Sequence, residues 1–590
     1  GASITSSTGT VSVTSSASSI SLGSAVSGAV VRMLPSTTYD GAGSLTASAG
    51  TLSISGGTTV APTGAIQASG NVTLSGSGQV STATNATVTS TGGSVSITST
   101  GANIALAKAV NASTSISISP STTYAGVGAL TAGTTLSISG GTTVSPTGNL
   151  TSAGDMTVSG SGQVTLSSIT AEVTGSGAVN ITGGTLASTN GGLEIITSTI
   201  KSTSGAINIT GNASASWGFY IRLTSKIQTT SGAITIIGNA PSNVWGGHIA
   251  GADVVSSSGS IVVDTKGSYG ISPGYNNLTN FGAVSPATST SNIQVIGNNY
   301  GESTYQNSVN YRTTGTVVIE STGTAFSNAP TMRAHTFDGN ASVRVGKSTN
   351  NSAVTIAGTA SIVGDYDVYG AAITQTAPVT TSSGDIAFTG AGAFSNAGAL
   401  NAGGGLYITG ATTLAATGAW TTNSALDVSA TGNISTGSVA AITVNTGYLS
   451  LVSSGGTVTI GDDTTVPGNV TLTGTGVTIS QPVTSSTGSV TVTASTGAVS
   501  IAGNVNAGTL ISVTPKTTYD GAGTLTASSG TLTISGGTSV APTGAIQASG
   551  AITISGSAAI TNATGATITS TGSSVSVTST GTTVNMSKAI

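Results

Sequence analysis

The stretch GAINI at residues 205–209 recurs as GAITI at 232–236 and as GSIVV at 259–263, 27 residues apart each time. In each copy a glycine precedes a short run in which apolar, mostly β-branched residues occupy alternate positions. Such alternation is the pattern of a short strand with one buried face. Similar runs, separated by Ser, Thr, Gly and Asn, recur throughout the chain, and no stretch shows the helical period. The sequence therefore predicts an all-β protein with no helices.

The distance between similar strands predicts how they are arranged. Elsewhere in the chain the spacing is nearer 20 residues than 27. A fixed period of this length is typical of solenoids, in which each repeat stacks on its neighbours and buries a continuous core. We therefore expect a parallel β-helix, or β-solenoid, with two or three short strands in each coil. At 20–27 residues per coil, the chain would form roughly 22–30 coils.

A second repeat operates over a much longer distance. Residues 35–110 match residues 515–590 without a gap, at an offset of 480. The motif TTYDGAG at 37–43 reappears at 517–523, and a partial third copy at 120–164 has Tyr124 in the place of Tyr39. We infer a superrepeat of about 480 residues that the parent protein repeats further. The chain starts at Gly1 without a signal-like segment, so we expect a mature or excised piece of a longer protein.

Composition excludes several classes of protein. Charged residues make up 5% of the chain, against roughly 25% in an ordinary globular domain. The net charge of -4 and the mean hydropathy of +0.30 argue against disorder. The chain has no stripe of basic residues that would predict nucleic-acid binding. It also has no apolar run that approaches the ~18 residues needed to span a bilayer. Cysteine is absent, which removes disulfides and thiolate metal sites.

The middle of the chain differs from the rest. Residues 194–370 hold 16 of the 28 charged residues, 14 of the 22 aromatic residues and both histidines. We therefore predict a repetitive shaft over 1–193, longer coils rich in aromatic and charged residues over 194–370, and a second shaft over 371–514. Residues 515–590 would begin the next superrepeat.

The best candidate binding site is a row of aromatic residues in this middle segment. Trp217 and Trp245 follow equivalent strands in successive coils, and Tyr269 has a similar place in the third coil. Beside Asn212, Asn239 and Asn243, exposed rings in a row would hold a sugar ring. The alternative is an aromatic ladder inside the wider 27-residue coils, where stacked rings have a structural role.

Catalytic and metal sites are not predicted. Glycosidases need two converging carboxyl groups, whereas the acidic residues of this segment occur singly along the chain. The close pairs Asp365 with Asp367 and Asp462 with Asp463 are interpreted as solvated turns, and His248 and His335 as loop residues. We therefore expect no cofactor, no metal and no enzymatic activity. The single acidic residues are Asp253, Asp264, Glu302, Glu320 and Asp338.

Runs such as ASGNVTLSGSG at 68–78 and GAITIIGNA at 232–240 resemble the repeats of filamentous-haemagglutinin-like bacterial exoproteins. The resemblance covers nearly the whole chain. It implies a right-handed parallel β-helix, export from a Gram-negative cell, and a role in adhesion or biofilm. The Asn-Pro-Asn motifs of that family's secretion domain are absent, which favours a shaft segment and leaves the secretion route open.

These observations favour a structural extracellular fibre. The chain would be the shaft of a bacterial surface adhesin or the subunit of a self-assembling surface filament. Its partner would then be itself, head-to-tail or side by side, or the neighbouring repeats of a longer chain. The alternative is a carbohydrate-binding adhesin module that uses residues 194–370 to bind surface glycans. Ice binding and a polysaccharide-acting β-helix are lesser alternatives.

Overall fold

The computed structural model describes residues 2–185, 191–241, 245–266, 271–273, 279–282, 289–297, 308–327, 329–332, 334–437, 441–588 and 590. Over these residues the chain contains 76 strands and no helix, and every described strand pairing is parallel. It follows that none of the described residues belongs to a helix that could cross a membrane. The prediction of an all-β chain is confirmed.

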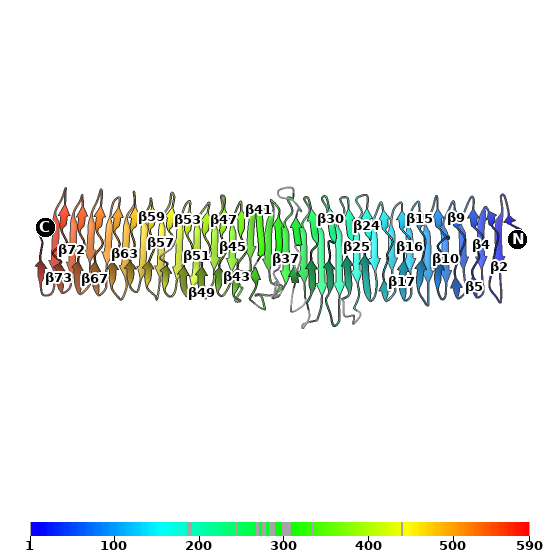
Figure 1. Ribbon diagram of the computed structural model, residues 1–590, viewed down its shortest axis with the longest axis horizontal. Coiled ribbons are helices and arrows are strands. Elements are labelled where there is room, and N and C mark those ends of the chain that lie inside the picture. Colours follow the sequence, from blue (N-terminus) through cyan, green and yellow to red (C-terminus); the bar gives the residue numbers. More distant parts are fainter. Residues whose placement is uncertain are drawn as a thin grey trace. The chain divides into compact units, whose positions relative to one another are not determined.

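The strands form four parallel sheets, which we name A to D. Sheets A and B hold 26 strands each, sheet C holds 11 and sheet D holds 13. Most successive strands go in turn to sheet A, sheet B and then sheet C or D, so most of the described turns have three sides, and there are about 26 turns (Figure 1). This agrees with the predicted number of coils.

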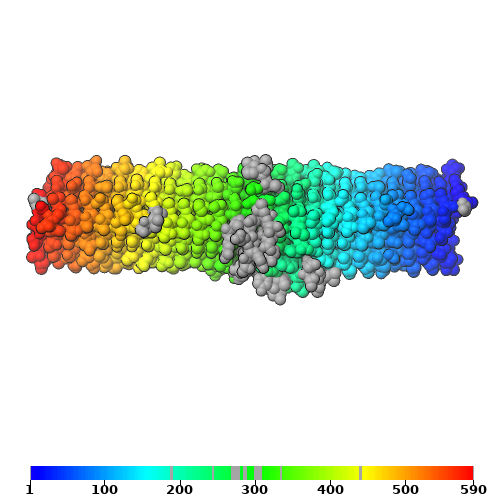
Figure 2. All heavy atoms as spheres, viewed as in Figure 1, coloured from blue at the N-terminus to red at the C-terminus, as the bar shows by residue number. Residues whose placement is uncertain are grey.

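The chain is divided into two compact units. The first comprises Gly1–Thr316 and Glu320–Gly323, and the second comprises Val317–Ile319 and Thr324–Ile590. Within each unit the sequence colours follow one another in narrow bands in the space-filling view, because each turn packs only on the turns before and after it (Figure 2).

Sheet C carries the candidate site and lies in the first unit. Its strands are β5 (Thr38–Tyr39), β8 (Thr59–Val60), β11 (Val80–Thr82), β14 (Ile104–Leu106), β17 (Thr123–Gly126), β20 (Thr143–Val144), β23 (Gln163–Ser167), β26 (Leu193–Ile196), β29 (Phe219–Arg222), β32 (Gly247–Ala250) and β35 (Ile271–Pro273).

Sheet D supplies the third side of the turns in the second unit. Its strands are β40 (Thr331–Met332), β43 (Val354–Ile356), β46 (Ile373–Gln375), β49 (Ala393–Asn396), β52 (Thr413–Ala416), β55 (Ile434–Thr436), β58 (Val458–Ile460), β61 (Val477–Ile479), β64 (Val499–Ile501), β67 (Thr518–Gly521), β70 (Ser539–Pro542), β73 (Ala559–Asn562) and β76 (Val584–Met586).

The register of the strands reproduces the spacing in the sequence. In sheet B, β28 (Ile207–Asn212) pairs with β31 (Ile234–Asn239), and β31 pairs with β34 (Ile261–Thr265). Ile207, Ile234 and Ile261 therefore stack in one column, and all three are fully buried. Alternate residues point outward, so the apolar positions of the repeat form the core, as the pattern predicts.

The copied sequence blocks adopt the same local structure. Each contains a Gly-Gly pair that turns the chain from sheet B toward the third side. Gly56 and Gly57 have φ of 102° and 71°, and Gly536 and Gly537 have φ of 106° and 78°. Only glycine adopts these left-handed values readily, so the pair is required at this corner. Tyr39 in sheet C and Tyr519 in sheet D then take equivalent buried places.

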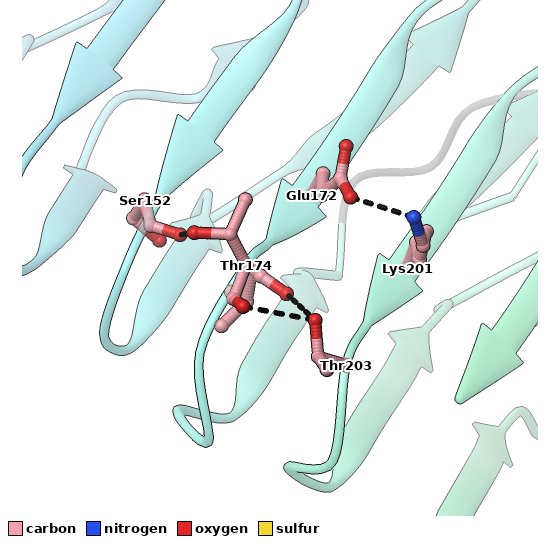
Figure 3. A network of polar contacts seen from close by, with 6 residues as sticks. Ser152, Glu172, Thr174, Lys201 and Thr203 are labelled. Carbon is pink, nitrogen blue, oxygen red and sulfur yellow. Dashed lines mark hydrogen bonds and ion pairs between the residues drawn. The ribbon is translucent and has the colours of Figure 1, made fainter. Parts of the chain in front are cut away.

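Hydroxyl groups tie neighbouring turns together. Ser and Thr side chains in the turn regions donate to backbone carbonyls of the preceding turn, as Ser90 does to Gly70 at 2.7 Å. Figure 3 shows two such steps: Thr174 donates to the carbonyl of Ser152 at 3.4 Å, and Thr203 to that of Thr174 at 3.0 Å. Each bond contributes about 0.5–1.5 kcal/mol. The abundant Ser and Thr therefore stabilise the stack with few charges.

Candidate functional site

The candidate site lies on the outer face of sheet C in the first unit. The register aligns Glu194 in β26 with Tyr220 in β29, and Tyr220 with His248 in β32. Their neighbours Phe219 and Ile221 point into the core and are fully buried, so Glu194, Tyr220 and His248 point outward.

Trp217 and Trp245 pack against this outer row. Each lies two residues before its strand, and their rings are stacked, with centroids 6.0 Å apart and planes 11° apart. Trp217 also stacks on Tyr220 at 5.7 Å and meets the ring of His248 edge-on at 4.9 Å. Both tryptophans are partly exposed. The predicted aromatic row therefore exists for these two residues, as a layer outside the sheet rather than a ladder inside the coil.

An ion pair completes the cluster. The Arg222 guanidinium contacts a carboxylate oxygen of Glu194 at 3.1 Å and lies over the Tyr220 ring, 4.7 Å from its centroid. The Glu194 side chain is only 7% exposed, while that of Arg222 is 34% exposed. Burying the Glu194 carboxylate would be costly without a partner charge, and Arg222 supplies that charge. The contact of the guanidinium with the Tyr220 ring also holds Arg222 in this position.

His248 is a strand residue and not the loop residue that the sequence suggested. It lies within β32 and is 2% exposed, because Trp217 and Tyr220 cover it. Burial, and next the charge of Arg222, lower the pKa of His248 to about 4, so the imidazole is neutral at pH 7. The loop prediction was also wrong for His335, which lies in β41 (Ala334–Asn340) and is 2% exposed. Apolar alternation around these residues was too weak to indicate strands.

The remaining predicted contacts have different outcomes. Tyr269 and Asn243 lie outside the described residues. Asn212 and Asn239, which flank the row in sequence, bind each other at the ends of β28 and β31 instead. Asn239 donates to Oδ1 of Asn212 at 2.7 Å, and Asn212 donates to the carbonyl of Gly183 at 2.8 Å. These amides therefore tie turns together.

Several acidic residues form hydrogen bonds within the solenoid, and two that were predicted to lie in solvated turns do not lie there: Asp367 is in a strand, β45 (Tyr366–Tyr369), and Asp462 is only 5% exposed. Asp253 accepts a hydrogen bond from Asn280 at 2.8 Å, and Glu320 accepts one from Gln294 at 3.1 Å. Asp365 accepts the backbone N–H of Asp385 at 2.9 Å, one turn along the chain. Across the described part of the chain, no three acidic or histidine side chains are grouped as metal ligands.

The sequence missed Glu194, Tyr220 and Arg222 as members of the cluster. Glu194 and Arg222 are 28 positions apart, and Glu194 was only one of several single charges in its segment. One signal was available: Trp217 and Tyr220 have aromatic counterparts 28 positions later, Trp245 and His248, one residue more than the 27-residue spacing of the strands in sheet B.

Searches of protein-family models, of curated proteins and of solved structures found no match to this chain.

Proposed function

We propose that the chain is a non-catalytic structural shaft of an extracellular bacterial fibre, of the filamentous-haemagglutinin-like kind. One observation carries the proposal: copied sequence blocks become copied turns. Thr59 pairs with Thr38 and Val60 with Tyr39, and the same positions pair in the second copy as Ser539 with Thr518 and Val540 with Tyr519. A block that keeps the same strand register in both copies lengthens a solenoid without changing how its turns stack.

The chemistry of the surface supports this role. Turns are joined by backbone ladders and by hydroxyl and amide bonds, which do not depend on charge and are little affected by salt. Such bonds suit an extracellular stalk, whose solvent is not controlled by the cell. The same properties suit a filament subunit, so a test has to distinguish a long single chain from a polymer.

The test is immunoelectron microscopy of cells that make the protein. A Fab raised against residues 35–110 would also recognise the copy at 515–590. We expect label at regular intervals along thin surface projections. If denaturation releases chains of about 590 residues, the projection is a polymer. If it releases one much larger chain, the projection is a stalk. Label confined to the cell interior would contradict the proposal.

A second candidate, a carbohydrate-binding module within residues 194–370, is favoured by the cluster on sheet C. Partly exposed tryptophans beside a charged, hydrogen-bonding Arg222 are the groups that hold a sugar ring. Their mutual stacking leaves fewer ring faces for a ligand. Glycan-array binding by the whole chain, lost in Trp245→Ala and retained when the exposed Tyr448 is changed to Ala, would support this candidate. Equal binding by both variants, or none by the parent, would reject it.

A further inference from the structure

Several exposed asparagines join neighbouring turns through a single side-chain atom, and four of them are followed two residues later by Ser or Thr. Asn71, Asn149, Asn433 and Asn469 each lie directly before a strand. The strands are β10 (Val72–Gly76), β21 (Leu150–Ser152), β55 and β60 (Val470–Gly474). In each asparagine Oδ1 accepts the backbone N–H of a residue in the next turn: Ser94 at 2.9 Å, Thr170 at 2.9 Å, Thr457 at 2.9 Å and Ser489 at 3.0 Å, respectively.

The other amide atom, Nδ2, is not used in this contact. Among the residues that the structure describes, no hydrogen bond engages Nδ2 of any of these four asparagines. Because Oδ1 is held by the next turn and the residue is exposed, Nδ2 is left on the solvent side of the amide. The side-chain nitrogen is therefore accessible from solvent, while the side-chain oxygen is bonded to the next turn.

Each of these asparagines also has a hydroxyl two residues later on the same outer face. These residues are Thr73, Thr151, Ser435 and Thr471. The residue between is apolar and fully buried in every case, namely Val72, Leu150, Ile434 and Val470. Asn-x-Ser/Thr with x other than Pro is the acceptor sequence for N-linked glycosylation, in which a sugar is attached to the asparagine side-chain nitrogen.

We propose that Asn71, Asn149, Asn433 and Asn469 are sites of N-linked glycosylation. A separate glycosyltransferase would supply the sugar from a donor in which the anomeric carbon is bound to a nucleotide or lipid diphosphate. The Nδ2–C1 bond forms as the C1–O bond to the diphosphate breaks, the diphosphate leaves with that electron pair, and one Nδ2 proton passes to a base of the transferase. Oδ1 is unchanged, so the contact with the next turn survives the modification.

The chain contains its own negative controls. Because Ser and Thr are abundant, the acceptor pattern arises often by composition alone, and position has to separate acceptors from non-acceptors. Asn350 and Asn562 also begin Asn-x-Ser/Thr sequences but are 8% and 4% exposed. Their Nδ2 atoms donate to the carbonyls of Tyr369 and Ala566, both at 2.8 Å. A sugar on either would break that bond and clash with the packed turn.

A third control separates the sequence requirement from the geometry. Asn504 holds the next turn as the four acceptors do, with Oδ1 accepting the N–H of Thr524 at 3.0 Å. The residue two positions later is Asn506, which has no hydroxyl. We therefore expect Asn504 to be unmodified. The inference does not depend on whether the solenoid is a stalk or a filament.

The test is peptide mapping by mass spectrometry of the full chain from the cells that naturally make it. A protease that cuts after small aliphatic residues is needed, because the chain has only 12 Lys and Arg residues. We expect sugar masses on Asn71, Asn149, Asn433 and Asn469 and none on Asn350, Asn562 or Asn504. Unmodified peptides at all four predicted positions, or sugar on the three controls, would overturn the inference.

A variant in the same cells tests the role of the hydroxyl. Thr73→Val keeps the shape of the side chain and leaves the contact between Asn71 and Ser94 in place. We expect complete loss of the sugar at Asn71 while the other three positions remain occupied. Sugar retained on Asn71 in Thr73→Val would contradict the assignment of Asn71-Val72-Thr73 as an acceptor sequence.

Discussion

The hydroxyl of Tyr39 lies directly over Gly41, where an added Cβ would come within 2.6 Å of the tyrosine oxygen. The same relationship holds between Tyr519 and Gly521, at 2.7 Å. Tyr124 and Gly126 repeat it in the partial copy. The repeated Tyr-x-Gly sequence is therefore a packing unit: the ring fills the core, and the glycine two residues later leaves room for its oxygen.

Gly41→Ala should consequently destabilise the turns around β5 and β8. The added methyl group meets the Tyr39 ring and forces it to move, at a cost of about 1–3 kcal/mol. Faster hydrogen exchange of the β5 and β8 amides would report this. Gly23→Ala is the matched control, because no atom lies within 4 Å of its added Cβ. Equal exchange rates in the two variants would contradict this explanation of the motif.

Tyr124→Phe should leave stability unchanged or increase it. The Tyr124 ring stacks between Ile104 and Val144 in the core, and its hydroxyl makes no hydrogen bond to any described residue. Burial raises the pKa of this hydroxyl well above its ordinary value. Removing a buried, unpaired hydroxyl avoids a desolvation cost of about 1–3 kcal/mol. A loss of more than about 1 kcal/mol in urea unfolding would show that the hydroxyl has a partner.

Val95→Asp should open the solenoid locally. Val95 is 1% exposed and lies between Val72 and Ile116 of the adjacent turns, so the aspartate would be an unpaired charge between turns. We expect protease cleavage near residue 95. The control is Ser96→Asp, because Ser96 lies on the outer face of the same strand, β13 (Val95–Ser99). Resistance of both variants to protease would show that the inward assignment is wrong.

Arg222→Met should lower the free energy of unfolding more than Lys201→Met does. Removing Arg222 leaves the nearly buried Glu194 carboxylate unpaired, which should lower the free energy of unfolding by about 3 kcal/mol. Lys201 pairs with Glu172 at 2.7 Å, but their side chains are 40% and 29% exposed (Figure 3). Such a surface pair contributes about 0–1 kcal/mol. Urea unfolding monitored by tryptophan fluorescence compares the two, and equal losses would contradict the burial of Glu194.

The region around His248 should lose stability in acid. Its folded pKa of about 4 lies below the ordinary value of 6.5, so the folded state disfavours the proton. The folded state is most stable above pH 6.5, where His248 is neutral in both the folded and unfolded chain. As the pH falls toward 4, the free energy of unfolding should decrease by about 3 kcal/mol in total. Tryptophan fluorescence of Trp217 and Trp245 should change over this range. A His248→Gln variant should lack the transition; if the transition persists unchanged, another group is responsible.

The fold could be predicted because one rule applies along the whole chain. Alternation at residues such as Val95 and Ile97 identifies inward positions, and the 27-residue spacing gives the register directly. The Tyr-x-Gly contact could not be predicted, since the sequence shows that Tyr39 and Gly41 recur together but not that the ring turns back over the glycine.

The candidate site was harder to predict for a related reason. Trp217 and Trp245 were predicted as neighbours because they share the repeat. Arg222 and Glu194 lie on different turns with no repeated partner, so their pairing depends on the exact register of sheet C. Repetition predicts what every turn shares, whereas a site consists of what one turn has and its neighbours lack.

The most direct test of the proposed shaft is X-ray diffraction from oriented native fibres. Parallel strands stacked turn upon turn place a repeat of about 4.8 Å along the fibre axis, with strands perpendicular to that axis. A strong meridional reflection at that spacing is the predicted result. Fibres that lack it, or that show the spacing on the equator, would contradict a shaft built from stacked turns of this chain.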